Sequence, residues 1–535
     1  MTANRRGTPS WGAGSRSVAL VATALLAAAC IHQFREVQVA EVAAADEPTA
    51  VTSPLKAHLK DGSVVVYRKG AIVSRSSVQG EGMRWDALRK DSLSVTSLAM
   101  DSVLGLESYT PGIDAGLTFG VSLLATAGMA VLTIGGGIAI ACILDPKCFG
   151  SCPTVYTYSA TGELLEAELF SYSVAPLLEG RDVDLLAARP DAAGRLQLEI
   201  RNEALETHLI NHIELLEVRH AADETVVPDA RGRPLVLGAR RSAVTLRDRG
   251  QRDVGAVLAA HDSLFFASDA ARLAGASITD FQDQIDLTLP RPATRDSIAV
   301  VLRMRNSLLN TVLFYDLMLA SAGAHALDWL GVDLQRIGPA VELGMWYRSR
   351  MGMRVSVEFD GTFLEVDRVP DSGPIAWKDV AVMLPVPQRG DSMRIRLSFV
   401  TDEWRIDQIA IAIDARHVEP RSVPILETVS LDGTPSHDAA YRLSEPDESY
   451  VETNPGTAFI VRFDAGPLPQ GNTRTFLLSS QGFYTEWVRP DWITGTSTAT
   501  RFEPDDATLL EALRRWRNVK DEFEQKFHDT RIPVR

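Results

Sequence analysis

The sequence has few cysteines, few aromatic residues and a shortage of basic charge. Its 535 residues include only four cysteines, and Phe, Trp and Tyr together make up 7% of the chain. Acidic residues outnumber basic ones by 69 to 54, for a formal net charge of −15. Large hydrophobic cores are possible in a chain of this length, so disulfides are not needed for stability. An acidic body repels phosphate backbones, and we expect no nucleic-acid partner.

Recognisable catalytic motifs are also missing. The sequence contains no GxSxG elbow, no P-loop and no GxGxxG. His208 and His212 are four residues apart, as in a zinc protease helix, but the segment His-Leu-Ile-Asn-His lacks the glutamate that would act as base. We therefore name no catalytic residue, no metal ligand and no cofactor, and expect a protein that is not an enzyme. A pair of facing carboxylates, however, cannot be recognised from sequence.

The N-terminus has the organisation of a secretory signal. Three arginines (Arg5, Arg6 and Arg16) precede an apolar stretch at 18–29, which ends in small residues before Cys30. The stretch is shorter than the roughly 20 apolar residues that a spanning helix needs. We predict a signal peptide at 1–29 and, from its Ala, Pro and acidic content, a flexible tether at 30–54.

Residues 26–30, Leu-Ala-Ala-Ala-Cys, resemble the lipobox of bacterial lipoproteins, although the leucine stands one place earlier than usual. The resemblance implies cleavage before Cys30, a lipid on that residue and a membrane as partner. In Gram-negative lipoproteins an aspartate after the cysteine marks retention in the inner membrane. Ile31 stands there instead, which favours the outer membrane, with the protein facing the periplasm or the cell surface.

An apolar, glycine-rich segment occupies residues 111–146. Residues 115–144 carry no charge, over a length that could contact or cross a membrane. The triplet Gly135, Gly136 and Gly137 disfavours a single continuous helix. A single span would place the two flanking regions in different compartments. We expect instead two short helices that meet near Gly135. Residues 55–110 and 145–535 would then lie on the same side of the membrane.

Three cysteines follow closely, at Cys142, Cys148 and Cys152. A zinc site usually needs four ligands, and no histidine lies nearby in sequence. In an oxidising compartment a disulfide is the expected state, with one thiol left over. Cys148 with Cys152 is the first choice, and a bridge between Cys148 and Cys142 remains open.

Residues 151–158, Ser-Cys-Pro-Thr-Val-Tyr-Thr-Tyr, followed by Thr161 and Gly162, resemble a segment found in uncharacterised bacterial exported proteins. In those proteins a segment of the form SCPxVYSYDG follows a hydrophobic stretch and opens a β-rich region. The resemblance covers about residues 140–490, and only the SCP block is specific. Ala160 stands here where an aspartate is usual. The family has no established activity, so the resemblance implies no catalytic residue.

Most of the remaining chain alternates apolar and polar residues, as antiparallel strands with one solvent-exposed face do. The alternation is clearest at 353–359, 394–399 and 409–413. We predict a mainly β protein of sandwich or jelly-roll-like modules. The expected units are a small β-meander or barrel at 55–110, a β-rich domain at 147–300, a helix with a sandwich at 301–420 and a β-rich domain at 421–495. The helix at 309–330 is inferred from Ala and Leu content, and spacing predicts an amphipathic helix over 505–528 within a C-terminal unit, 496–535.

Two functions fit these features. The first is an envelope lipoprotein that binds or assembles with an unknown protein or glycan. The alternative is an exported carbohydrate-active hydrolase or glycan-binding protein. Trp346, Tyr347, Trp377 and Trp404 lie in the expected sandwich, where aromatic residues can form a sugar platform but more often pack in the core. A hydrolase requires a concave pocket with two close carboxylates, one of raised pKa; a binding module requires an exposed apolar or aromatic patch.

Overall fold

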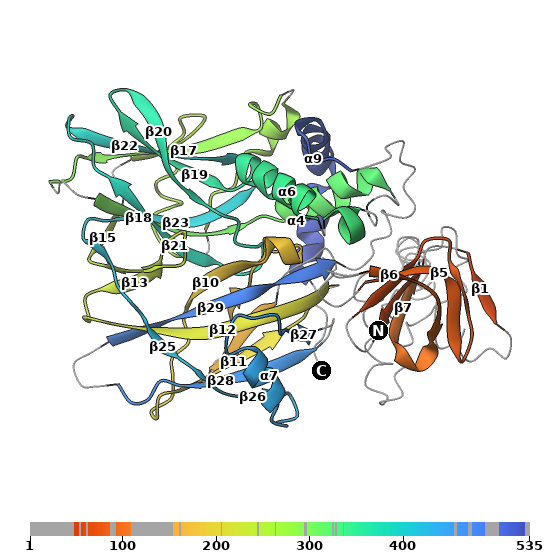
Figure 1. Ribbon diagram of the computed structural model, residues 1–535. Coiled ribbons are helices and arrows are strands. Elements are labelled where there is room, and N and C mark those ends of the chain that lie inside the picture. Colours follow the sequence, from red (N-terminus) through yellow and green to blue (C-terminus); the bar gives the residue numbers. More distant parts are fainter. Residues whose placement is uncertain are drawn as a thin grey trace, which may run out of the picture.

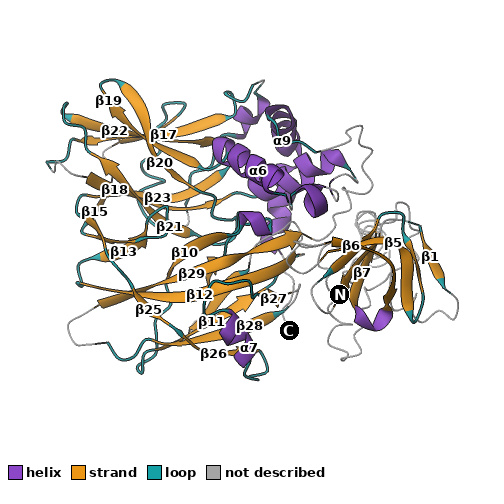
Figure 2. Cartoon of the chain, in the orientation of Figure 1, coloured by secondary structure: helices purple, strands orange, loops and turns teal. Residues whose placement is uncertain are grey.

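The computed structural model describes residues 48–108, 153–486 and 502–529, apart from short gaps within these ranges. The described chain is mainly β, as predicted, and its strands form six antiparallel sheets. Figure 1 shows the N-terminal sheet on one side, two stacked β-sandwiches on the other and a group of helices beside the sandwiches. Figure 2 shows how small the helical share is.

The N-terminal sheet has seven strands in the order β1-β4-β5-β3-β2-β7, with β6 paired to β5. Its core contains Leu55, Val65, Tyr67 and Val103, all nearly inaccessible to solvent. Gly70 has φ +79 in the turn between β3 and β4, a conformation that glycine adopts without strain. The elements are β1 (Thr49–Val51), β2 (Leu55–Leu59), β3 (Val64–Tyr67), β4 (Ala71–Val73), β5 (Ser77–Trp85), β6 (Ser92–Ala99), η1 (Met100–Ser102) and β7 (Val103–Ser108).

The first sandwich joins strands from both ends of the remaining chain. One sheet has the order β26-β28-β11-β8-β9, and the other has the order β10-β29-β12-β25 with β27 paired to β12. Apolar residues of both sheets form one shared core, which includes Ile200, Ile213 and Phe463. The strands are β8 (Thr154–Ser159), β9 (Gly162–Glu168), β10 (Gly180–Leu186), β11 (Arg195–Arg201), β12 (Glu206–His220), β25 (Arg421–Val423), β26 (Ile425–Ser430), β27 (Val451–Thr453), β28 (Ala458–Asp464) and β29 (Thr473–Glu486).

The second sandwich pairs a sheet of order β15-β23-β18-β21 with one of order β16-β17-β22-β19-β20. Met353, Val355 and Val357 of β19 face its core and their neighbours do not, which confirms the alternation seen in the sequence. The strands are β15 (Arg240–Ser242), β16 (Thr245–Asp248), β17 (Gln282–Pro290), β18 (Ser297–Asn306), β19 (Met353–Phe359), β20 (Thr362–Val369), β21 (Lys378–Pro385), β22 (Ser392–Val400) and β23 (Trp404–Ala412).

A small sheet of order β13-β14-β24 packs against both sandwiches. Leu235 of this sheet joins a cluster with Val301 of the second sandwich, while Val236 joins a cluster with Leu216 of the first. The two faces of β14 therefore pack against different sandwiches and connect them. The strands are β13 (Thr225–Pro228), β14 (Pro234–Leu237) and β24 (Ala415–His417).

Most of the helices form a separate core at one end of the sandwiches, whereas α7 lies against β26 of the first sandwich (Figure 2). Within the described residues, the helical segment expected at 309–330 appears as short helices at 309–322 and 329–333, partly of the wider π form. Helix α9 confirms the predicted C-terminal amphipathic helix and buries Leu509, Leu513 and Trp516. The helices are η3 (Pro176–Leu178), η4 (Ala270–Ala274), α4 (Leu309–Thr311), η5 (Val312–Met318), η6 (Leu319–Ala322), η7 (Trp329–Asp333), α6 (Ile337–Arg350), α7 (His437–Arg442) and α9 (Asp506–Asp529).

Candidate functional site

A cavity of about 610 Å³ lies where the two sandwiches meet the helices. Its volume falls within the usual range of small-molecule sites. Exposed residues, among them Arg231, Arg348 and Pro370, line it together with buried ones, so it reaches the surface. Its polar lining residues are Glu168, Ser171, Tyr172, Arg231, Asn306, Asn310, Thr311, Tyr315, Tyr347, Arg348, Asp367, Arg368, Asp371 and Tyr484.

Asn306, at the end of β18, shapes one wall of the cavity. Its side-chain Oδ1 accepts hydrogen bonds from the backbone N–H groups of Ser372 at 2.7 Å and Gly373 at 3.1 Å. Its Nδ2 donates to Oδ1 of Asp371 at 3.2 Å. Asn306 is 1% exposed, so these bonds form away from bulk water. A single buried amide therefore holds both the loop after β20 and the carboxylate that this loop carries.

Asp371, which lines the cavity, is paired with the carboxyl group of Glu403, which is not a lining residue. Glu403 lies behind Asp371, is fully buried, and accepts hydrogen bonds from the backbone N–H groups of Gly352 at 2.5 Å and Val400 at 2.9 Å. Burial raises the pKa of Asp371. Burial, followed by the neighbouring charge of Asp371, raises the pKa of Glu403 well above its usual range. Two such groups hold a proton more strongly than free carboxylates do.

Tyr347 of α6 completes this group. Burial raises the pKa of its phenol well above 10, and the charge of Asp371 adds to the effect. The phenol therefore stays protonated and keeps an O–H donor next to the acidic pair. Of the four aromatic residues singled out in the sequence, Tyr347 alone lines the cavity.

Asn310, on the short helix α4, is the most unusual residue of the cavity. It is 9% exposed, and within the described part of the chain neither its Nδ2 nor its Oδ1 makes a hydrogen bond of good geometry, although the amide lies close enough to Asp371 to favour the charged form of that carboxyl group and so oppose the rise in its pKa. The buried Oδ2 atom of Asp371 likewise has no partner at hydrogen-bonding geometry among the described residues. A buried amide left unsatisfied costs about 1–3 kcal/mol, so native proteins seldom keep one without a purpose.

Glu168, at the end of β9, brings the first sandwich to the same wall. Its Oε2 accepts hydrogen bonds from the backbone N–H groups of Ile375 at 2.7 Å and Ala376 at 3.1 Å, both in the second sandwich. Gly373 has φ +83, and a Cβ at this position would lie 2.4 Å from the carboxyl carbon of Glu168. Glycine is therefore needed where the loop and the carboxylate approach each other. Glu168 and Asp371 thus line one cavity from two different units.

Three tyrosines, Tyr172, Tyr315 and Tyr484, add aromatic ring surfaces to the wall. The Tyr315 hydroxyl donates to the Tyr484 hydroxyl at 3.4 Å, and the Tyr484 hydroxyl lies 3.2 Å from the backbone oxygen of Ser171. The Tyr172 hydroxyl donates to the backbone oxygen of Arg181 at 2.6 Å, and burial raises the pKa of Tyr172. These bonds hold the rings in place. The cavity thus combines ordered aromatic surfaces with a polar wall.

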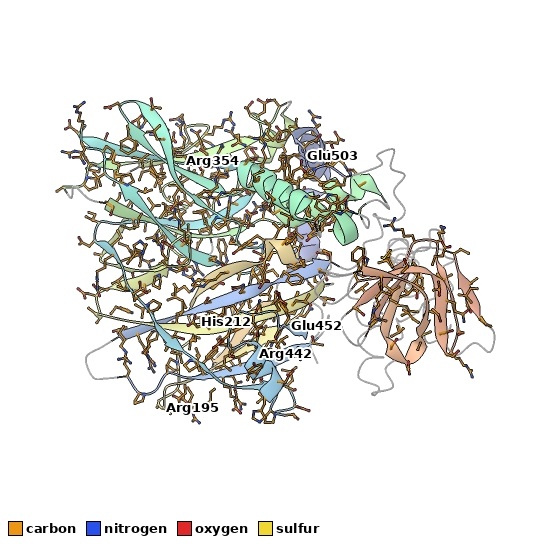
Figure 3. The ribbon with its side chains drawn as sticks, in the orientation of Figure 1. Arg195, His212, Arg354, Arg442, Glu452 and Glu503 are labelled. Atoms are coloured by element: carbon orange, nitrogen blue, oxygen red, sulfur yellow. The ribbon has the colours of Figure 1, made fainter. Side chains whose placement is uncertain are left out.

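The remaining aromatic and histidine candidates lie elsewhere. Trp404 is fully buried in the second sandwich, Trp346 packs against the helical core, and Trp377 contacts Phe265 with ring centroids 6.0 Å apart. His208 is buried on β12, and His212 lies on the same strand, where Figure 3 labels it. Among the other histidines, which the sequence did not single out, His220 lies 2.9 Å from the Thr475 hydroxyl and His261 is 3.9 Å from Asp407; His325 is outside the described residues.

No group of three or more His, Cys, Asp or Glu residues suited to a metal ion occurs among the described residues. Cys30, Cys142, Cys148 and Cys152, with the signal peptide, most of the tether and the apolar segment 115–144, lie outside the described ranges. In the part that is described, no helix combines the length and apolar character needed to cross a membrane.

The sequence did not single out Asn306, Asn310, Asp371, Glu168 or Glu403. No local signal marks them, because each owes its role to burial by strands or helices distant in sequence. Of the residues that form the polar wall of the cavity, only Tyr347 was named in the sequence analysis, as one of four aromatic residues.

Comparisons with known proteins give no family. No family model matches the chain, and no curated protein does. Among solved structures, the C-terminal CBM6 of a marine laminarinase from Zobellia galactanivorans is 12% identical, with 37% of this chain and 98% of that chain covered and a TM-score of 0.14. An exo-beta-1,3-galactanase from Phanerochaete chrysosporium is 8% identical, with 68% and 82% covered and a TM-score of 0.16. Similarity this weak carries no argument about fold or function.

Proposed function

We propose that this protein binds a small polyhydroxylated ligand of the saccharide class in the cavity between its sandwiches. One observation carries the proposal. The amide of Asn310 and the Oδ2 atom of Asp371 are buried beside the cavity, and neither makes a hydrogen bond of good geometry in the described chain. A ligand that satisfied them would remove an energetic penalty which the free protein bears.

The chemistry of the wall favours hydroxyl groups over other ligand groups. Asn310 offers both a donor and an acceptor, Asp371 offers an acceptor and Tyr347 offers a donor. A sugar hydroxyl is donor and acceptor at once, so one ring can satisfy several of these groups. The tyrosine rings of the wall supply surfaces for the apolar face of a sugar ring.

The test uses Asn310→Leu, which removes both unpartnered atoms from the wall. Isothermal titration calorimetry with trisaccharides of glucose, galactose and xylose should detect binding to the wild type and none to the variant. Tripeptides of alanine serve as a comparison of similar size without ring hydroxyls. If the wild type binds no saccharide, or binds equally well with leucine at position 310, the proposal is wrong.

The free energy of unfolding provides a control on folding. Asn310→Leu should leave it unchanged or raise it, because no hydrogen bond of good geometry is lost. Asn202→Leu, by contrast, removes an amide that donates to Glu206 O at 2.8 Å and Thr453 O at 2.9 Å, and should lose about 1–3 kcal/mol. A variant that is stable but does not bind would separate ligand recognition from folding.

Hydrolysis of a bound saccharide is a second candidate function, favoured by the carboxyl groups of Asp371 and Glu168, which both line the cavity. Asp371 holds its proton more strongly than a free carboxylate, as a general acid does, and Glu168 brings a second carboxylate to the same cavity. Asp371→Asn would then abolish release of reducing ends while binding persists. A wild type that binds trisaccharides and never cleaves them would exclude hydrolysis of these substrates.

We further propose that the protein is a lipoprotein of the bacterial envelope, attached through Cys30. Export would place the cavity outside the cytoplasm, where envelope and environmental glycans are found. The lipobox-like residues 26–30 support this proposal. The cavity and the anchor are independent of each other, and each has its own test.

A further inference from the structure

Helix α6 carries a row of exposed apolar side chains. Ile337 is 72% exposed, Val341 50% and Met345 64%. Their spacing of four residues places them on one face of the helix, and we refer to these three residues as the α6 stripe. Leu177 of η3, which is 48% exposed, adds to the apolar surface near this helix.

The orientation of α6 is fixed by packing on its other faces. Ala340 and Leu343 are buried in the helical core, and a Cβ on Gly344 would lie 3.3 Å from Leu178 of η3. The helix therefore already buries other side chains in the protein core, and the α6 stripe is left on its exposed face. Three large apolar side chains in a row on a helix surface indicate a contact with something else.

Residues 115–144 are the matching part of this chain. They contain no charged residue and lie outside the described ranges. The chain returns to the described structure at Pro153, whose backbone oxygen accepts a hydrogen bond from Leu169 N at 2.9 Å. The next residue, Thr154, pairs with Glu168.

Glu168 connects this point to α6. It lines the same cavity as Leu343 and Tyr347 of α6. The chain that follows residue 144 therefore enters the first sandwich beside the cavity that α6 also borders. The eight residues from 145 to 152 can span about 26 Å when extended, which exceeds the roughly 21 Å length of α6. The connection between the apolar segment and the cavity that α6 borders is therefore short.

We propose that residues 115–144 dock on the α6 stripe of their own chain. Both surfaces are apolar, and both are removed from water by the contact. The short connection at 145–152 gives the segment an effective concentration in the millimolar range at the stripe, well above that of a second copy of the protein. The inference does not depend on the ligand of the cavity.

The experiment places the photo-crosslinking residue p-benzoylphenylalanine at position 341 of the full-length protein in bacterial membranes. After irradiation, mass spectrometry should find position 341 joined to a peptide within 115–144. The same residue at position 364 is the control, since Leu364 on β20 is an apolar residue 51% exposed outside the stripe. A mixture of isotopically labelled and unlabelled chains distinguishes links within one chain from links between chains.

Other products would overturn the proposal. Links between two chains would identify a second copy as the occupant, and links to lipid would identify the membrane. Links to 115–144 no more frequent than from position 364 would show that nothing specific docks there.

Elastase cleavage provides an independent measurement. The double variant V341Q/M345Q should be cleaved within 115–144 several-fold faster than the wild type, whereas L364Q should not. Equal rates for all three proteins would also overturn the proposal.

Discussion

The indole of Trp516 and the carboxylate of Asp402 join the C-terminal helix to the second sandwich. Trp516 Nε1 donates to Oδ2 of Asp402 at 2.8 Å, and both residues are fully buried. Lys520 Nζ donates to the other oxygen of Asp402 at 2.8 Å, as does Arg405 Nη1 at 3.0 Å. One carboxylate in the turn before β23 thus receives two groups of α9.

The first prediction concerns this junction. Trp516→Phe should lower the free energy of unfolding by about 1–3 kcal/mol, because Asp402 loses a donor in a buried site. Urea unfolding followed by circular dichroism measures the change without relying on tryptophan fluorescence. Arg517→Gln, on the exposed side of the same helix, should change stability by less than about 0.5 kcal/mol. Equal losses in the two variants would contradict the assigned role of Trp516.

The second prediction concerns pH. The raised pKa of Asp371 means that the folded protein binds more protons than the unfolded chain above the ordinary carboxyl pKa. Stability should therefore fall as pH rises from about 4 toward the raised pKa, by about 1.4 kcal/mol per unit of pKa elevation. Asp371→Asn keeps the acceptor for Asn306 and should make this slope smaller, while the raised pKa values of Glu403 and Asp184 maintain part of it.

Chemical unfolding at a series of pH values, from 4 to 8, would measure the slope for wild type and variant. Asp223→Asn, at an exposed position, serves as the control and should leave the slope unchanged. If Asp371→Asn also leaves the slope unchanged, Asp371 is not the group that binds the additional proton.

The third prediction concerns the contact between the two sandwiches. Lys378 of β21 forms ion pairs with Asp182 and Asp184 of β10, the second at 3.1 Å. The charges of these carboxylates raise the pKa of Lys378 against the effect of burial, and burial raises the pKa of Asp184 to about 7. Lys378→Met should lower the free energy of unfolding by about 3–5 kcal/mol, because it leaves two buried carboxylates without their cation.

The triple variant D182N/D184N/K378M removes every charge of this group. In urea unfolding it should recover much of the stability that Lys378→Met loses, because no uncompensated charge stays buried. A triple variant as unstable as the single one would mean that packing of the lysine stem, and not charge, is responsible.

The fourth prediction concerns the anchor. Cys30→Ala should abolish labelling with radioactive palmitate and release the protein from membranes, since the thiol is the only attachment point that the lipobox-like sequence provides. Cys148→Ala is a matched control and should leave labelling intact. A wild-type protein without label would show that the lipoprotein interpretation is wrong.

The sequence predicted which segments form strands better than it predicted which strands pair with each other. The alternation at 353–359 follows from the two faces of a strand, and it correctly indicates which side chains of β19 are buried. The same pattern contains no information on partners. Nothing in residues 206–220 indicates that β12 pairs along its length with β29, which begins at Thr473.

The candidate site could not be predicted for the same reason. Asn310 in the sequence is an ordinary polar residue before an apolar run, and its burial depends on helices and loops that meet only in the folded protein. Glu403 follows Asp402 in a turn, where acidic residues are common and usually exposed. Tyr347 was considered because aromatic residues of a sandwich can form a sugar platform, but its position in the cavity became evident only from the structure.

The return of the chain to the first sandwich affects how the protein can fold. Arg181 of β10 bonds to Ser479 of β29 across 298 residues of sequence, and β29 lies between β10 and β12 in the finished sheet. Until the end of the chain has been synthesised, β10 and β12 therefore lack their shared neighbour, and their open edges can pair with other chains. High contact order of this kind slows folding. A chain that terminates before residue 473 should thus aggregate, even though its second sandwich is complete.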